Sequence, residues 1–370
     1  MLTPSRAPSA APAPRHRARW SVLTAGVCAA SLLLAGCSGD EPKAPSDPVT
    51  TEVTPGATAA KVAPPAPAVP PTWALTGVAA SDIVNRPALA VKIENSREAR
   101  PQTGLEQADV VWEEMVEGGV TRYIAVYHSQ VPETVGPIRS VRPMDSNIIA
   151  PLRGLMVFSG GQPVFVQSVS AVGLQVISHD AGASGFYRSK DRRAPHNVYG
   201  TPATFLSQAN ADHSASPAPE FVFARDETQA TAAVVGAPTS TVAVTMSTYS
   251  KPSWTWDAAS GTFQRSESGA PAVSAAGARL AAKNVVVMSV AMYNTGTVDP
   301  AGSPVPESEV VGSGAALVAT GGKSIPATWS KASPGAPFVL TAADGTPVKL
   351  APGQTWVELV PTTSGSFSTS

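Results

Sequence analysis

Cysteine is almost absent from this 370-residue sequence, and both copies, Cys28 and Cys37, lie near its beginning. The rest of the chain can therefore form no disulfide, supply no thiolate nucleophile and build no cysteine-based metal site. The stability of a folded region must come from hydrophobic cores. The roughly 290 residues from Trp73 onward are enough to bury one or two of them.

The apolar run from Val22 to Leu34 is too short, and too rich in alanine and glycine, to span a bilayer as a permanent helix. Basic residues precede it between Arg15 and Arg19, and the tetrapeptide Leu34-Ala35-Gly36-Cys37 follows and resembles a bacterial lipobox. We therefore predict that residues 1–36 are a lipoprotein signal peptide. Cys37 would then be lipidated with a diacylglyceryl group, whose acyl chains include fatty acids such as palmitate. An ordinary signal peptide or an uncleaved anchor is the alternative.

Charged residues make up only 14% of the chain. Removal of residues 1–36 takes away four arginines and no acid, so that 26 basic and 27 acidic side chains become 22 and 27. The resulting net charge of about −5 argues against binding to nucleic acid, and against electrostatic adhesion to anionic lipid. Contact with the membrane is therefore expected through the two acyl chains on Cys37, which suffice for stable anchoring at the extracytoplasmic face.

The segment from residue 37 to residue 72 contains nine prolines and almost no large apolar side chain. Such a composition cannot bury enough surface to offset the entropy of ordering, which predicts a disordered tether with polyproline character. Trp73 marks the start of the folded part.

Residues 73–212 have the pattern of a mixed α/β domain. Strands are expected at 88–94, 109–116, 121–128, 154–158 and 174–178, and helices at 144–152, 163–172 and 202–209. The polar stretch 210–220 is a boundary, after which residues 213–362 read as a mostly β domain. Its strands are expected at 242–246, 253–256, 261–265, 284–293, 315–320, 324–330, 337–341, 348–350 and 355–360. Residues 363–370 are expected to be a disordered tail.

Several long motifs resemble the YerB-like lipoprotein family, which comprises bacterial envelope lipoproteins with a domain of unknown function. The motifs stand at 85–95, 100–105, 108–109, 113–114, 136–142, 159–161, 193–197, 284–287, 321–323 and 352–356. The resemblance covers nearly all of residues 75–361. It implies a two-domain envelope lipoprotein and carries over no catalytic residues.

Two arginine-containing segments are the strongest candidates for a binding site. Arg139 and Arg142 lie between two prolines, and Arg192 and Arg193 belong to a second basic run. Guanidinium groups bind carboxylate and phosphate groups through two hydrogen bonds, so a convergence of the two segments would create an anion pocket. Internal pairing of these arginines with nearby carboxylates is the alternative. The loop Ser159-Gly160-Gly161 follows a predicted strand and could add main-chain N–H donors.

Acid–base chemistry has weaker candidates. Glu94 and Glu113 on neighbouring strands could form a carboxylate pair, whereas Glu113 and Glu114 must point to opposite faces of one strand. His196 could serve as an acid–base group, although a structural histidine is the commoner case. No histidine shows metal-ligand spacing, so we expect neither a metal nor another cofactor.

Tryptophans 254, 256, 329 and 356 could stack on sugars, but a place in the core is the better interpretation. The favoured function is that of a non-catalytic binding or scaffold module. Its ligand would be an anionic envelope component such as peptidoglycan, a phosphorylated glycan or a partner protein. The alternative is a cell-wall-modifying hydrolase or transferase that uses glutamate and histidine as acid–base groups.

Overall fold

The structure, a computed structural model, describes residues 69–370, which belong to one compact unit. The predicted signal peptide, the lipidation site Cys37 and most of the predicted tether lie outside the described residues. No helix in the described part is long and apolar enough to cross a membrane.

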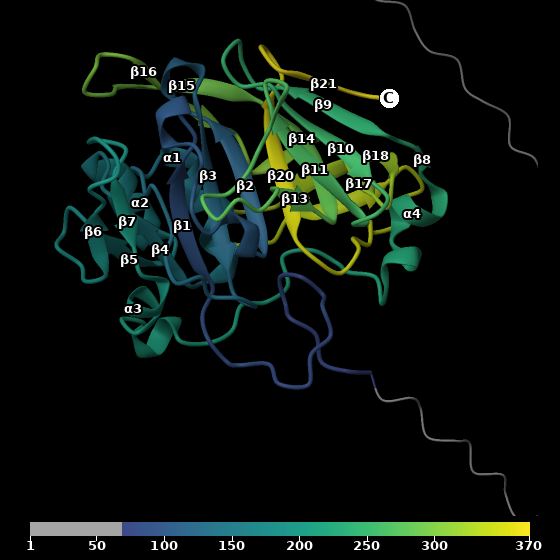
Figure 1. Ribbon diagram of the computed structural model, residues 1–370, viewed down its shortest axis with the longest axis horizontal. Helices are drawn as coiled ribbons and strands as arrows, with labels where there is room; N and C mark the ends of the chain where they lie inside the picture. The colour runs from purple at the N-terminus through teal and green to yellow at the C-terminus, as the bar shows by residue number, and fades with distance from the viewer. Residues whose placement is uncertain (1–68) are drawn as a thin grey trace, which may run out of the picture. The chain divides into compact units, whose positions relative to one another are not determined.

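An 11-stranded sheet runs through both halves of the folded chain in the order β19-β18-β17-β14-β20-β2-β3-β1-β4-β5, with β8 beside β18 (Figure 1). Its strands are β1 (Leu89–Glu94), β2 (Val110–Met115), β3 (Thr121–Tyr127), β4 (Leu155–Phe158), β5 (Gln175–Ser178), β8 (Ala237–Pro238), β14 (Asn284–Val290), β17 (Gly312–Thr320), β18 (Lys323–Lys331), β19 (Val339–Ala342) and β20 (Thr355–Pro361). The late strand β20 pairs in parallel with both β2 and β14, and it thereby joins the two halves.

The pairing gives the sheet one dominant direction. Strands β14, β20, β2, β1, β4 and β5 all run the same way, and β3 is antiparallel between β2 and β1. The carboxyl ends of β1, β2 and β4 therefore meet at one edge, which is where ligands of open, mostly parallel sheets bind. We call this edge the carboxyl edge.

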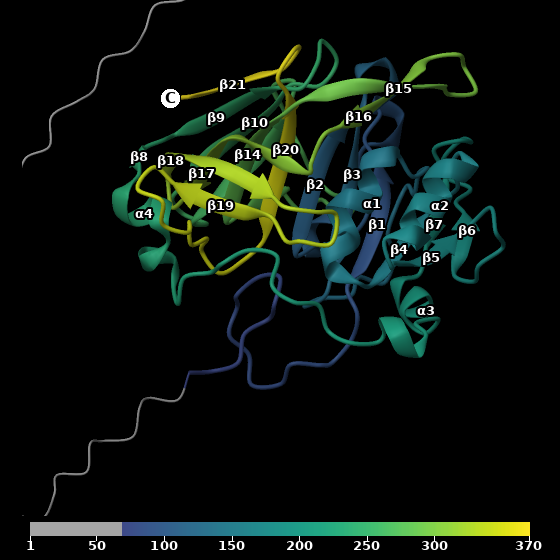
Figure 2. The same ribbon diagram turned by 180° about the vertical axis from the view of Figure 1, so that it is seen from behind.

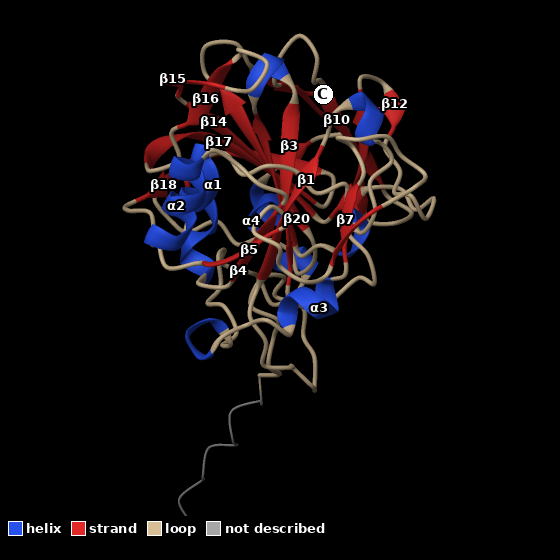
Figure 3. Ribbon diagram, turned by 90° about the vertical axis from the view of Figure 1, so that its left-hand side faces the viewer, coloured by secondary structure: helices blue, strands red, loops and turns tan. Residues whose placement is uncertain are grey.

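Both faces of the large sheet are covered, which explains the unbroken apolar runs of its central strands. One face packs on α1 (Pro143–Ile149) and α2 (Pro163–Ala171), as Figure 3 shows. The other face packs on a six-stranded sheet. Its strands are β9 (Thr241–Thr245), β10 (Pro252–Asp257), β11 (Thr262–Glu267), β12 (Ala270–Pro271), β13 (Ala281–Ala282) and β21 (Ser366–Thr369). We call these the helix face and the sheet face of the large sheet.

The smaller elements lie around these layers. Strands β15 (Met292–Val298) and β16 (Pro304–Ser308) form a hairpin that extends from the large sheet (Figure 2). Strands β6 (Phe186–Arg188) and β7 (Val198–Gly200) form a second two-stranded ribbon. The short helices are α3 (Pro202–Leu206) and α4 (Thr231–Val235). The single 3₁₀ turns are η1 (Arg97–Ala99), η2 (Leu105–Gln107), η3 (Glu117–Gly119), η4 (Ala150–Leu152), η5 (Ala211–His213) and η6 (Glu227–Gln229).

The predicted fold class is confirmed: a mixed sheet with helices in the N-terminal half precedes a strand-rich C-terminal half. Two predicted strands were wrong in detail. The run 284–293 is interrupted, because β14 ends at Val290 and β15 begins at Met292. The stretch 348–350 makes only an isolated bridge, between Leu350 and Phe223.

The predicted disordered tail is also wrong at its end. Residues 366–369 form β21, which pairs antiparallel with β9, and Phe367 packs against the core on the sheet face. The serines and threonines of the tail gave no hydrophobic signal. Their order comes from main-chain hydrogen bonds to an otherwise open strand edge.

Candidate functional site

Two buried ionic clusters lie at the carboxyl edge, one on each face of the large sheet. They follow from the alternation of side chains along β2, because Glu113 points to the sheet face and Glu114 to the helix face. Both glutamates are fully buried. Buried charges are tolerated only when they are paired and hydrogen-bonded, so the surroundings of each glutamate are decisive.

On the sheet face, the fully buried Arg265 of β11 joins the two sheets. Its guanidinium lies 2.6 Å from Glu113 of β2, 2.9 Å from Glu267 of its own strand and 2.8 Å from Glu358 of β20. Three aromatic rings surround it, with centroids 4.8–5.5 Å from the guanidinium carbon: those of Tyr123, Trp254 and Trp356. We call Arg265 and its three glutamates the arginine hub.

Two carboxyls of the hub, those of Glu113 and Glu358, have pKa values shifted in opposite directions. Burial and the neighbouring Glu113 carboxylate raise the pKa of Glu358 well above its usual range. Burial alone would also raise the pKa of Glu113, but the Arg265 charge and several hydrogen bonds outweigh it and lower that pKa. The shifts have opposite directions: they favour the protonated form of Glu358 and the ionised form of Glu113 as the partner of Arg265.

On the helix face, Lys92 of β1, Glu114 of β2 and Asp145 of α1 form a fully buried triad. The Lys92 ammonium lies 2.8 Å from Asp145 and also contacts Glu114. Asp145 additionally accepts the main-chain N–H of Arg142 at 2.8 Å, which fixes the start of α1. Burial and the Asp145 charge raise the pKa of Glu114 well above its usual range.

Next to this triad, Glu117 holds two arginines. The Arg142 guanidinium contacts both of its oxygens, at 2.5 and 2.8 Å, and Arg122 of β3 lies 3.9 Å away. Burial and then the Arg142 charge lower the pKa of Arg122 to about 9. Arg142 is buried and already paired, which is the structural role left open as the alternative for it.

Glu94 contacts one side chain near each predicted arginine segment: Arg139 of the first, and His196, which follows Arg192 and Arg193 of the second. This carboxylate ends β1 and is 5% exposed; one of its oxygens lies 3.3 Å from Nε of Arg139 and 2.9 Å from Nδ1 of His196. Its other oxygen is buried without a hydrogen-bond partner among the described residues. The segment around Arg139 is held by the loop 159–161, through Ser159 N–H to Arg139 C=O (3.0 Å) and Val141 N–H to Gly160 C=O (2.9 Å).

A surface hollow of about 710 Å³ lies beside His196. We call it the arginine hollow, and it is lined by Glu98, Arg100, Asp191, Arg192, Arg193, Ala194 and His196. Arg192 donates to the carbonyls of Glu98 (2.7 Å) and Pro101 (2.6 Å), so its guanidinium is fixed. Arg193 is exposed, and within residues 69–370 its side chain makes no ion pair or hydrogen bond.

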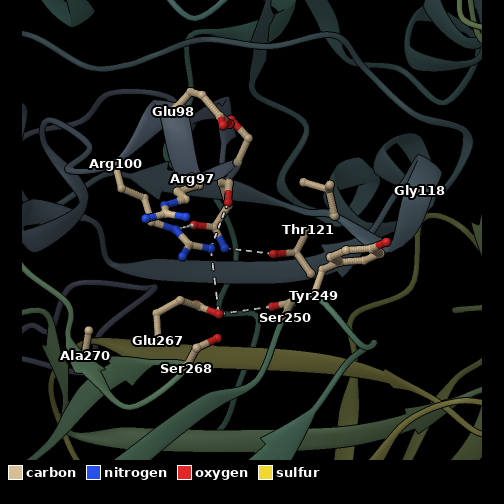
Figure 4. A pocket seen from close by; sticks show the side chains of 13 residues that line it. Arg97, Glu98, Arg100, Gly118, Thr121, Tyr249, Ser250, Glu267, Ser268 and Ala270 are labelled. Atoms are coloured by element: carbon tan, nitrogen blue, oxygen red, sulfur yellow. Dashed lines mark hydrogen bonds and ion pairs between the residues drawn. The ribbon is translucent and has the colours of Figure 1, made fainter.

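A second hollow of about 660 Å³ lies on the other side of the η1 turn (Figure 4). We call it the tyrosine groove, and it is lined by Asn95, Ser96, Arg97, Glu98, Arg100, Gly118, Val120, Thr121, Tyr249, Ser250, Glu267, Ser268 and Ala270. Glu98 and Arg100 line both hollows, so the two cavities are neighbours. The groove lies between loops of the large sheet and loops of the six-stranded sheet.

The candidate acid Glu113 does not reach either hollow. Its carboxylate is enclosed by Arg265, Thr121 (2.6 Å) and Asn95 (3.2 Å), and it is fully buried. Glu94 and Glu113 therefore do not flank an open space, whereas Glu94 and His196 form a hydrogen-bonded pair. The loop 159–161 lies against the Asp180 carboxylate, since a Cβ on Gly160 would overlap that group.

Sequence patterns did not single out Arg100, Tyr249, Arg265 or Glu117. Arg265 could have been identified, because every second residue of its strand is buried: Phe263, Arg265 and Glu267 all lie on the inward side. The other three lie in or after turns, where no periodicity shows which side chain will face a cavity.

Two family descriptions match the chain. Residues 75–215 match "Protein of unknown function (DUF3048) N-terminal domain", and residues 242–357 match the C-terminal domain of the same family. Among curated proteins, "Putative lipoprotein YerB" of Bacillus subtilis (strain 168) is 35% identical over 127 residues. The matched stretch is 34% of this chain. It covers 38% of the length of the curated relative.

A solved structure is also similar to this one. The crystal structure of the YerB protein from Bacillus subtilis superposes with a TM-score of 0.68 and 24% sequence identity. The superposition covers 80% of this chain and 99% of the other. Similarity at that level of identity shows a shared fold and no more.

Proposed function

We propose that this chain, a member of the DUF3048 family, is a lipid-anchored binding module at the extracytoplasmic face of the cell membrane. The family membership agrees with the resemblance that its motifs indicated. Its ligand is an anionic component of the envelope: peptidoglycan, a phosphorylated glycan or an acidic partner protein. The name of the curated relative, a lipoprotein, supports the anchor. The lipobox tetrapeptide ending at Cys37 supports the position of the lipid.

One observation carries the binding role: the arginine hollow gathers Arg100, Arg192 and Arg193 in a protein whose net charge is negative. Arg192 is fixed by main-chain carbonyls, and His196 is oriented by Glu94, so both groups are preorganised. Arg193 is left to bind a ligand. A guanidinium favours a carboxylate or phosphate through paired, charge-assisted hydrogen bonds.

The neighbouring residues have supporting roles in this proposal. Arg139 keeps Glu94 in place beneath His196, and Arg142 fixes Glu117 and the start of α1. The loop Ser159-Gly160-Gly161 positions the Arg139 segment through main-chain bonds. The ligand is therefore expected to contact Arg193 directly, whereas Arg139 contributes indirectly by holding Glu94.

The anchor can be tested by metabolic labelling with palmitate in a bacterium that processes lipoproteins. The wild-type chain is expected to carry label and to sediment with membranes, and Cys37→Ser is expected to lose both properties because no thiol accepts the lipid. Cys28→Ser is the matched control, since it alters the other cysteine inside the predicted signal peptide. Label that persists in Cys37→Ser would contradict the proposed anchor.

Binding can be tested with residues 37–370 carrying Cys37→Ser, titrated with N-acetylglucosamine 1-phosphate in a calorimeter. Arg193→Ala is expected to weaken binding at least about tenfold, the effect of losing one hydrogen bond to a charged group. Arg225→Ala, which removes an exposed arginine outside the hollow, is expected to leave the affinity unchanged. Affinity should fall as salt is raised. Equal affinities in all three proteins would exclude the arginine hollow as the site.

A second candidate function is favoured by the Glu94–His196 pair. An Nδ1–H that donates to Glu94 leaves Nε2 of His196 as an acceptor on a side chain lining the hollow, the arrangement of a general base. Such a base would take a proton from a water that attacks a wall component. Turnover of wall fragments by the wild-type chain, lost in His196→Ala while phosphate binding persists, would favour this hydrolase over the binding module.

A further inference from the structure

The tyrosine groove has a composition that differs from that of the arginine hollow. Its lining includes guanidinium donors, carboxylate acceptors and hydroxyl groups, and the aliphatic side chains among its lining residues are Val120 and Ala270. Its two arginines, Arg97 and Arg100, are balanced by Glu98 and Glu267. The groove therefore has no net charge to attract an anion, but it offers hydrogen bonds of both kinds.

The floor of the groove is rigid because it is continuous with the arginine hub. Glu267 is 7% exposed, with one oxygen bonded to Arg265 at 2.9 Å. Its other oxygen has only long contacts, 3.4 Å to Ser250 and 3.7 Å to Arg100. This oxygen is an acceptor with unused capacity, held in place by the fully buried Arg265.

The wall of the groove holds an exposed aromatic ring. Tyr249 is 73% exposed, and its main chain is anchored: its N–H donates to the hydroxyl of Ser247, which donates to the carbonyl of Gly119. The ring lies against Gly119, where a Cβ would come within 3.3 Å of it. Gly119 has a φ of +75°, which glycine adopts without strain. Figure 4 shows Arg97 and Arg100 on one side of the groove and Tyr249 on the other.

From this arrangement we propose that the tyrosine groove binds the sugar rings of a glycan strand. Tyr249 stacks on the apolar face of one ring, while Arg100 and Glu267 bond to sugar hydroxyls. Sugar hydroxyls both donate and accept hydrogen bonds, which matches the donors and acceptors that line the groove. The tyrosine side chain supplies a large contact area at little entropic cost. The volume lies within the roughly 300–1,000 Å³ of small-ligand sites.

This proposal names the ligand class of the proposed function. It rests on that function for one contact, the one between an anionic substituent and Arg193. Because Glu98 and Arg100 line both cavities, a strand whose rings occupy the groove can place an anionic substituent against Arg193 in the arginine hollow. Two linked contacts raise the overall affinity above that of either alone. The ligand class is thus an anionic glycan rather than an acidic protein.

The test uses residues 37–370 carrying Cys37→Ser and a neutral probe, the β-1,4-linked tetramer of N-acetylglucosamine, measured by calorimetry. Tyr249→Ala is expected to weaken binding of the tetramer about tenfold or more, and the affinity is expected to be insensitive to salt. Tyr293→Ala is the matched control, because it removes a tyrosine that is 50% exposed on the β15–β16 hairpin. Arg225→Ala, which removes an exposed arginine outside both cavities, should bind the neutral tetramer as the wild type does.

The outcomes separate the two proposals. Binding of N-acetylglucosamine 1-phosphate without binding of the tetramer would overturn the glycan inference and leave the anion-binding function standing. Tetramer binding that is equal in wild type and Tyr249→Ala would place the sugar elsewhere and also overturn it. Tetramer binding lost in Tyr249→Ala, together with a phosphate affinity that is weakened in Arg193→Ala and unchanged in Arg225→Ala, would support both.

Discussion

Replacement of Arg265 by methionine is expected to lower the free energy of unfolding by about 3–5 kcal/mol, the usual result of removing one partner from a buried ionic network. The variant leaves the carboxylates of Glu113 and Glu267 buried without their counter-ion. It also removes a cation from between three aromatic rings. Urea unfolding of residues 37–370 with Cys37→Ser, followed by circular dichroism, measures this loss.

Glu358→Gln is the informative comparison within the same hub. Burial and the Glu113 charge raise the pKa of Glu358 well above its usual range, which favours its protonated form. An amide in its place preserves the charge of that form. We expect a loss of no more than about 1 kcal/mol, the size of one hydrogen bond. Arg225→Ala, at an exposed position, should stay within about 0.5 kcal/mol of wild type. Equal losses for Arg265→Met and Glu358→Gln would contradict the assigned charges.

Lys92→Met is expected to have a similarly large effect on the opposite face of the sheet, about 3–5 kcal/mol. Methionine fits the space of the lysine stem but leaves Asp145 buried without its cation and removes the hydrogen-bond partner of Glu114. Asp145 keeps only the main-chain N–H of Arg142, so the start of α1 is expected to loosen as well. The same urea titration, read together with protection of the α1 amides in hydrogen exchange, checks both effects.

Glu114→Gln is the control for the triad. Burial and the Asp145 charge raise the pKa of Glu114 well above its usual range, which favours its protonated form, and glutamine preserves the charge of that form. The expected loss is about 1 kcal/mol or less. If Glu114→Gln proved as costly as Lys92→Met, Glu114 would have to be the ionised partner of the lysine.

The fold class and most elements could be predicted from the sequence, because buried strands leave continuous apolar runs and turns leave glycine and proline. The predicted strand 88–94, for example, differs from β1 by one residue. The pairing of β20 with β2 could not be predicted, since strand order depends on contacts between segments some 245 residues apart. The order of β21 was missed because main-chain pairing leaves no trace in side-chain type.

The candidate site was predictable in part. The arginine segments were identified from residue chemistry, and the alternative of internal pairing was stated for each; the structure pairs Arg139 with Glu94 and Arg142 with Glu117. The tyrosine groove was not predicted, because its walls come from four turns that only the packing of two sheets brings together. Tyr249 belongs to no recognisable motif. The sequence suggested tryptophans as possible sugar-stacking residues instead, but Trp254 and Trp356 are fully buried.

The position of β20 has a consequence for the order in which the molecule can assemble. Synthesis delivers a chain from its N-terminus, yet this central strand begins only at Thr355 and pairs on both sides, with β2 and with β14. Until those last residues arrive, the sheet consists of two fragments with open edges that invite mispairing. A chain truncated before residue 355 would therefore be a target for proteases rather than a shorter working protein.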